Sequence, residues 1–97
     1  MRLNFEWDEV KAKQNIAKHH VGFDEAKTVF NDVDTITIDD PDHSIEEERY
    51  IDIGQSELGR ILVVVYTERE DKIRIISARN ATNAEKKVYE LNRSGIR

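Results

Sequence analysis

Cysteine is absent from this chain of 97 residues. Without thiols, neither a disulfide framework nor a thiolate metal site can form, so the fold must rest on its hydrophobic core or on a partner. A reducing compartment suits such a chain, and we expect it to be cytoplasmic.

Long apolar runs are absent as well. No segment approaches the ~20 apolar residues that span a bilayer, and the first residues, Met-Arg-Leu-Asn-Phe-Glu-Trp-Asp, lack the apolar stretch of a secretion signal. We therefore expect neither membrane insertion nor secretion.

Several catalytic motifs are missing. The sequence holds no Gly-rich phosphate loop, no HExxH helix and no GxSxG elbow. His43 with Asp40 and Asp42 could be imagined as a metal site, but three loop residues so close together rarely complete a coordination shell. We expect no metal and no cofactor.

The residues that are present indicate a folded chain. Apolar residues make up 38% of the sequence and gather in compact runs such as residues 61–65, which is not typical of disorder. The length fits one domain, residues 1–97, with room for one core and one site.

Charge is distributed unevenly. The net charge of −5 divides into 0 for residues 1–30, −9 for residues 31–59 and +4 for residues 60–97. The middle of the chain is therefore acidic and its last third is basic, which matters more for nucleic-acid binding than the total.

Three helices are predicted. Asp8 is a good N-cap for a first helix over residues 8–18, and a second helix is predicted over residues 23–30. Thr82 and Glu85 have the spacing of a capping box, which predicts a third helix that ends near Leu91.

Four strands are predicted over residues 35–38, 49–54, 60–67 and 72–79, and a short strand around Leu3 and Phe5 could precede them. Ile36 and Ile38 are expected to face inward. Short connections favour an antiparallel meander with the apolar third strand in the centre, one face covered by helices and the other free. The fold class is thus α+β: two N-terminal helices, a meander of about four strands and a C-terminal helix.

Two basic sets of residues could bind phosphate. Lys11, Asn15, Lys18 and His19 follow each other at helical spacing and could grip a phosphodiester, or they form a solvated face on which Asn15 satisfies a loop backbone. The predicted sheet carries four arginines that could clamp a phosphate or could instead pair with nearby glutamates at positions 46–48 and 68: Arg49, Arg60, Arg74 and Arg79.

His43 is the candidate general acid. It lies in a loop between two aspartates and three glutamates, and these would favour its charged form. The alternative is an ordinary solvated loop histidine.

An ordered set of short motifs resembles the BrnT family of type II toxins. The motifs are Phe5-Glu6-Trp7-Asp8, then Lys11, Asn15, Lys18 and His19, Phe23-Asp24-Glu25-Ala26, Asp39-Asp40-Pro41-Asp42-His43-Ser44, Glu47-Glu48-Arg49-Tyr50, Gly59-Arg60, Val65-Tyr66-Thr67-Glu68-Arg69 and Arg74-Ile75-Ile76-Ser77-Ala78-Arg79. Two positions depart from the family pattern: His20 stands where Gly is usual, and Gly22 stands where a Ser-like cap is common.

The resemblance implies a RelE-like ribonuclease fold, RNA cleavage that arrests translation, and neutralisation by a BrnA-like antitoxin with a ribbon-helix-helix DNA-binding end. DNA would be contacted only through that antitoxin. Our leading hypothesis is a metal-independent endoribonuclease. In it, Arg74 and Arg79 stabilise the transition state, Arg49 holds the scissile phosphate and His43 protonates the leaving oxygen.

The remaining candidates, Lys11, Lys18, His19 and Arg60, would bind the RNA backbone. The rival hypothesis is a non-catalytic module that holds an antitoxin and modulates its DNA binding. The acidic middle segment favours this rival, because an acidic surface suits a basic partner.

Overall fold

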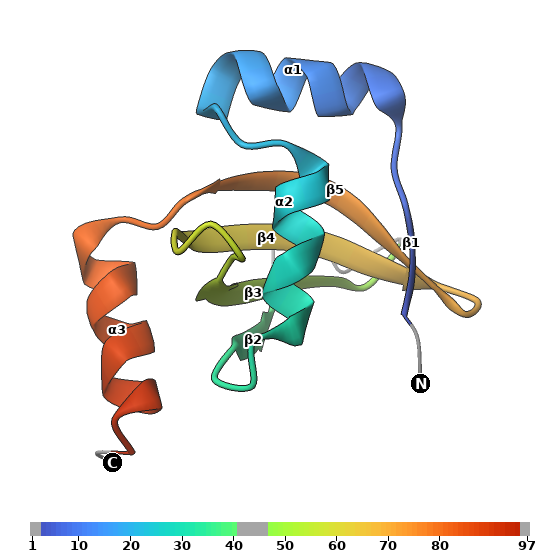
Figure 1. Cartoon of the computed structure of the whole chain (residues 1–97). Helices are drawn as coiled ribbons and strands as arrows, with labels where there is room; N and C mark the ends of the chain where they lie inside the picture. The colour runs from blue at the N-terminus through green and yellow to red at the C-terminus, as the bar shows by residue number, and fades with distance from the viewer. Residues whose placement is uncertain (1–2, 41–46, 96–97) are drawn as a thin grey trace.

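The computed structural model describes residues 3–40 and 47–95, and Figure 1 shows how the elements are arranged. In chain order they are β1 (Asn4–Glu6), α1 (Glu9–His19), α2 (Phe23–Ala26), the 3₁₀ helix η1 (Lys27–Asn31), β2 (Ile36–Asp39), β3 (Arg49–Gln55), β4 (Ile61–Arg69), β5 (Lys72–Asn80) and α3 (Asn83–Arg93). Within this described part of the chain, no helix is long and apolar enough to cross a membrane.

The strands form one sheet in the order β1-β5-β4-β3-β2. Strands β2 to β5 are successive antiparallel neighbours, which confirms the predicted meander with β4 in the centre. The first strand instead pairs in parallel with β5, from Asn4 opposite Lys72 to Glu6 opposite Arg74. A parallel pair needs a long crossover. The local pattern therefore indicated a strand near Phe5 but could not reveal its partner.

Side-chain caps fix where α1 and α3 begin. The Asp8 carboxylate accepts hydrogen bonds from the backbone N–H groups of Val10 at 2.8 Å and Lys11 at 3.1 Å. At α3, the Thr82 hydroxyl accepts from the Glu85 N–H, while the Glu85 side chain accepts from the Thr82 N–H. Both predicted caps are confirmed.

The predicted second helix, residues 23–30, changes type partway. It begins at Phe23 as an α-helix and continues as the 3₁₀ helix η1 from Lys27 onward. At the junction, the Thr28 hydroxyl donates to the Glu25 carbonyl oxygen at 2.6 Å. Such local bonds compete with regular helix geometry. The helical segment was therefore placed correctly, but its second half is not an α-helix.

Most of the hydrophobic core lies on one face of the sheet, which we call the first face. Figure 1 shows α2 and η1 crossing this face, and α1 running beside β5. The buried side chains come from these helices, from the turn after α1 and from β4 and β5: Ala12, Val21, Phe23, Ala26, Val29, Leu62, Val64, Ile75 and Ala78.

The opposite side, which we call the second face, is only partly covered. The side chain of Tyr89 in α3 packs there against Ile53 and Val63, and its hydroxyl donates to Asp32 Oδ2 at 2.6 Å. Our expectation of a helix-free face is therefore wrong at this end, because a buried tyrosine anchors α3. Away from α3, Ile38, which we expected to face inward, is 47% exposed.

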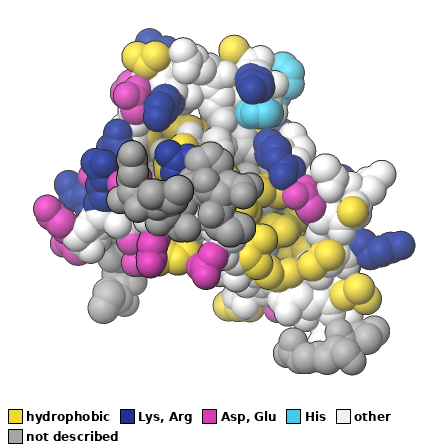
Figure 2. Space-filling model, turned by 180° about the vertical axis from the view of Figure 1, so that it is seen from behind, with side chains coloured by type: hydrophobic (Ala, Val, Ile, Leu, Met, Phe, Trp, Pro, Cys, Tyr) yellow, Lys and Arg dark blue, Asp and Glu magenta, His cyan; other side chains and the backbone are white. Residues whose placement is uncertain are grey.

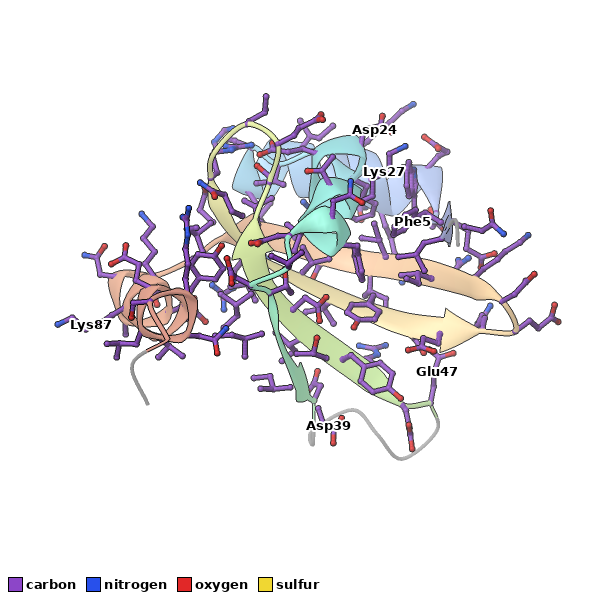
Figure 3. The ribbon with its side chains drawn as sticks, turned by 60° about the horizontal axis from the view of Figure 1, so that its bottom comes forward. Phe5, Asp24, Lys27, Asp39, Glu47 and Lys87 are labelled. Carbon is purple, nitrogen blue, oxygen red and sulfur yellow. The ribbon has the colours of Figure 1, made fainter. Side chains whose placement is uncertain are left out.

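Figure 3 looks along α3 and shows Lys87 pointing away from the sheet, whereas Asp39 lies at the end of the edge strand β2. The helix therefore covers one end of the second face.

Candidate functional site

A row of paired residues crosses the second face of the sheet. Arg49 of β3 pairs with Thr67 of β4, Thr67 pairs with Arg74 of β5, and Arg74 pairs with Glu6 of β1. Paired residues project from the same face, so Arg49 and Arg74 flank Thr67 with Cα atoms about 10 Å apart. Thr67 is 1% exposed and its hydroxyl donates to the Glu48 carbonyl oxygen at 2.7 Å. The structure thus places two arginines side by side above a rigid strand.

These two arginines differ in their partners. Arg74 Nη1 lies 3.0 Å from Glu6 Oε2, and Lys72 Nζ lies 3.8 Å from the other oxygen of the same carboxylate. Within residues 3–40 and 47–95, the Arg49 guanidinium forms no hydrogen bond or ion pair. Among the described residues, therefore, no side chain occupies the donors of Arg49, whereas Arg74 is oriented by Glu6.

Arg79 lies farther along the same face. It pairs with Val63, four residues before Thr67 on β4, or about 13 Å along the strand. Its guanidinium makes two hydrogen bonds to Glu85, at 2.7 and 2.9 Å, and these hold the pKa of Glu85 down at about 2. The structure therefore brings Arg74 beside Arg49 and holds Arg79 against α3.

A cavity of about 260 Å³ lies between α1 and β5. Its lining combines the cationic stripe of α1 with two residues of the strand: Lys11, Gln14, Asn15, Lys18, His19, Ile76 and Ser77. A β-bulge shapes the strand side, because Val65 pairs with Ser77 while the next residue, Tyr66, pairs with Ile75. Bulges redirect side chains and occur often beside active sites.

Figure 2 shows the second face from behind, with Lys and Arg side chains along its upper margin near the histidines, and a hydrophobic patch toward α3. Part of this view is occupied by residues whose placement is not described. The cations of the cavity, Lys11 and Lys18, come from α1, and the arginines of the row come from β3 and β5.

Asn15 has a structural role. Its amide donates to the carbonyl oxygens of Val21 and Ala78, both at 2.8 Å, and its oxygen accepts from the Ala78 N–H at 3.2 Å. The interpretation that Asn15 satisfies a loop backbone is confirmed, and the same side chain also ties α1 to β5. Lys11, Lys18 and His19 remain as the polar residues of the predicted stripe that can meet a ligand.

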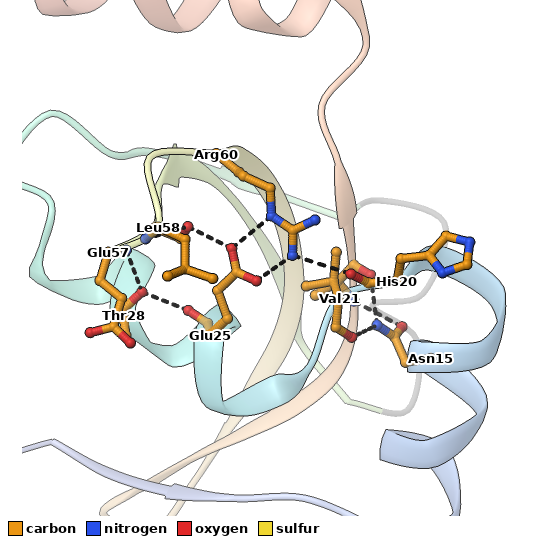
Figure 4. Close-up of polar contacts among 10 residues, drawn as sticks. Asn15, His20, Val21, Glu25, Thr28, Glu57, Leu58 and Arg60 are labelled. Atoms are coloured by element: carbon orange, nitrogen blue, oxygen red, sulfur yellow. Dashed lines mark hydrogen bonds and ion pairs between the residues drawn. The ribbon is translucent and has the colours of Figure 1, made fainter.

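Arg60 lies away from the row of arginines. Its guanidinium is paired with Glu25 and also donates to the His20 carbonyl oxygen at 3.2 Å (Figure 4). The alternative that these arginines pair with glutamates therefore holds for Arg60, Arg74 and Arg79. Their partners are Glu25, Glu6 and Glu85, and not the expected glutamates at positions 46–48 and 68.

The predicted general acid, His43, lies outside the described residues. Among those that are described, no group of three or more His, Cys, Asp or Glu side chains is arranged to hold a metal ion.

Sequence reasoning missed two polar residues of the cavity, Gln14 and Ser77. Gln14 lies three residues after Lys11 and four before Lys18, so helical spacing could have identified it. Ser77 could not be found in this way, because the bulge that brings it to the cavity leaves no local sequence signal.

Comparisons with known proteins identify the family and a similar fold. Residues 7–85 match the family model described as ribonuclease toxin, BrnT, of type II toxin-antitoxin system. A search of curated protein sequences gave no significant match. Among solved structures, the chain is similar in fold to the Brucella abortus ribonuclease toxin, BrnT, with a TM-score of 0.63 and 24% sequence identity over 84% of this chain and 100% of that one. The chain therefore belongs to the BrnT family of ribonuclease toxins of type II toxin-antitoxin systems.

Proposed function

We propose that this toxin cleaves RNA without a metal ion, through attack of a ribose 2′-OH on the adjacent phosphate. A base takes the 2′-OH proton, the new 2′-O–P bond forms and the P–O5′ bond breaks. The leaving 5′ oxygen takes up a proton. The products are a 2′,3′-cyclic phosphate and a free 5′-OH.

The observation that carries the proposal is that Arg49 and Arg74, both half-buried, flank Thr67 on one face of the sheet. Negative charge accumulates on the phosphate oxygens as the fifth bond to phosphorus forms, and preorganised guanidinium donors stabilise that charge. Glu6 helps to preorganise Arg74, and Arg49 is free among the described residues to hold the phosphate. His43 is our proposed general acid, since it lies in the segment that leads into β3 and Arg49.

The α1 stripe extends the proposed binding surface beyond the scissile phosphate. Lys11, Lys18 and His19 line the cavity beside β5, where they would contact the neighbouring RNA backbone. Arg79 lies about 13 Å along the strand from the row of Arg49 and Arg74, so we assign it to a flanking phosphate. About four phosphate contacts in all would give a salt dependence of log K on log salt near −3.

A type II toxin works with a cognate antitoxin, and we propose a BrnA-like ribbon-helix-helix protein for this role. Any contact with DNA would be made by that antitoxin. We expect both proteins in the cytoplasm, where RNA is the substrate and translation is arrested.

Cleavage of a defined single-stranded RNA by the purified toxin, with EDTA present, tests the proposal. Arg74→Ala should reduce kcat about 100-fold, by analogy with the loss of one transition-state donor, whereas Lys87→Ala should not, because Lys87 points away from the sheet (Figure 3). Products with 2′,3′-cyclic phosphate ends are expected. Absence of cleavage by folded wild-type protein would favour the non-catalytic alternative, and activity that EDTA abolishes would contradict metal independence.

A further inference from the structure

Arg60, just before β4, and Glu25 of α2 form an ion pair that joins two segments far apart in the sequence (Figure 4). Arg60 Nε donates to Glu25 Oε2 at 2.9 Å, and Nη2 donates to Oε1 of the same carboxylate. Glu25 is only 9% exposed, and the Ser56 hydroxyl also donates to its Oε2 at 2.7 Å. Because the carboxylate engages both Nε and Nη2, along one edge of the planar guanidinium, it holds that group in one orientation.

The same guanidinium fixes the turn at the end of α1. Arg60 Nη2 donates to the His20 carbonyl oxygen at 3.2 Å. The next carbonyl, that of Val21, accepts from the Asn15 amide, which also bonds Ala78 of β5. Two consecutive carbonyls are thus held by side chains, that of His20 by Arg60 and that of Val21 by Asn15, which is itself bonded to β5.

This turn needs external support. His20 has φ = 60°, in the left-handed region, where a residue with a Cβ is at a disadvantage relative to glycine. Its N–H closes the helix by donating to the Ile16 carbonyl at 2.9 Å, and the chain beyond it is held by the bonds from Arg60 to the His20 carbonyl and from Asn15 to the Val21 carbonyl. Lys18 and His19 immediately precede this turn and line the cavity.

We propose that Arg60 is a positioning residue that acts through His20: it fixes the end of α1 so that Lys18 and His19 stay directed at the cavity and its RNA. This inference rests on the proposed function, in which those two residues bind the RNA backbone. It differs from the expectation from sequence that Arg60 itself contacts RNA, because Glu25 occupies the Nε–Nη2 edge of the guanidinium and the His20 carbonyl also accepts from Nη2. The hydrogen bonds from Arg60 also lower the pKa of Glu25, so the pair stays ionised at neutral pH.

The double variant Glu25→Gln/Arg60→Met tests this role. It leaves no unpaired buried charge and keeps an acceptor for Ser56, but the His20 carbonyl loses its donor. We expect KM for RNA, and Kd for a non-cleavable 2′-deoxy analogue, to rise about three- to tenfold with kcat within about twofold of wild type. Contacts that bind ground state and transition state equally change KM alone.

Arg60→Lys distinguishes positioning from direct contact. Lysine keeps the positive charge opposite Glu25 but lacks the fork that reaches the His20 carbonyl at the same time. A positioning role therefore predicts a raised KM for this variant and faster amide hydrogen exchange at His20. A wild-type KM with unchanged exchange would instead mean that the charge alone matters, which overturns the proposal.

Two further variants serve as controls. Val29→Ala removes a buried contact on the first face and should lower stability without raising KM. Lys18→Ala should raise KM directly. If Lys18→Ala raises KM while the double variant does not, the positioning role is wrong and the proposed function stands. If neither variant alters KM or Kd, the proposed RNA contacts of α1 are wrong, and the role of Arg60 falls with them.

Discussion

The two faces of the sheet contrast in how completely they are covered. The first face is packed against α1, α2 and η1, and its cluster includes nine buried side chains. The second face has a smaller cluster of four, anchored by α3, and it also carries the exposed Ile38 and the half-buried Arg49 and Arg74. The contrast teaches that the main core lies on one side of the same five strands, opposite the arginines for which we propose RNA binding.

The largest expected effect is on the first face. Phe23→Ala removes a buried ring that packs edge-on against Trp7 with centroids 5.9 Å apart. We expect the free energy of unfolding to fall by about 3–5 kcal/mol, measured by urea denaturation. The matched change on α3, Val88→Ala, should cost less than about 0.5 kcal/mol, because Val88 is 53% exposed. Equal losses of stability in Phe23→Ala and Val88→Ala would contradict the difference in packing between the two faces.

A change at the second face should affect activity and leave stability nearly intact. Arg49→Ala is expected to lower kcat for RNA cleavage about 100-fold, because a donor to the transition state is lost. Its free energy of unfolding should change by less than about 0.5 kcal/mol, since the side chain has no ion pair among the described residues. Arg69→Ala, on the exposed end of β4, is the control and should keep wild-type kcat. A large stability loss in Arg49→Ala would show that this face also supports the fold.

A buried carboxylate on the first face gives a prediction about pH. Asp52 accepts hydrogen bonds from the Thr37 hydroxyl at 2.7 Å and the Tyr66 hydroxyl at 2.9 Å, but burial dominates and raises its pKa above the ordinary value. The native state therefore holds this proton more tightly than the unfolded state does, and the penalty for ionised Asp52 grows as pH rises from about 4 through the raised pKa.

Asp52→Asn removes this penalty. The variant should be more stable than wild type by about 1 kcal/mol at pH 7, and the difference should shrink as pH falls toward 4. Urea denaturation across this range measures both curves. A difference that grows toward acid pH would mean that the fold stabilises the ionised carboxylate, which is incompatible with a raised pKa for Asp52.

The smallest effect is expected at His20, which caps the C-terminal end of α1. His20→Gly should raise the free energy of unfolding by up to about 1 kcal/mol, because glycine adopts the left-handed conformation without steric cost. Thermal denaturation of the two proteins measures this gain. Gly59→Ala, also at positive φ with open space around it, is the opposite control and should lose stability.

Local patterns predicted the elements of this fold well. Asp8 and Thr82 carry the information for helix starts within a few residues, and short connections between strands fix the order of β2 to β5. The pairing of β1 with β5 and the packing of α3 on the second face depend on contacts between distant segments. Neither leaves a local periodicity, so sequence reasoning did not find them.

For the candidate site too, local patterns predict which residues lie together, whereas contacts between distant segments leave no local signal. Hairpin pairing makes it possible to expect Arg49 and Arg74 on a common face, and helical spacing brings Lys11 and Lys18 together. The partners of the arginines could not be foreseen. Arg60 meets a glutamate 35 residues earlier in the chain, which only the packed structure determines.

The parallel edge strand has a consequence for how the chain assembles during synthesis. Strands β2 to β5 can pair as soon as each hairpin emerges from the ribosome, because their contacts are close in sequence. Glu6 must wait until Arg74 has been made, 68 residues later. The carboxylate that orients Arg74 is thus among the first groups translated and, by this ordering, joins the sheet after the meander has formed. In the nascent toxin, the meander therefore forms before the ion pair between Glu6 and Arg74 orients the arginine.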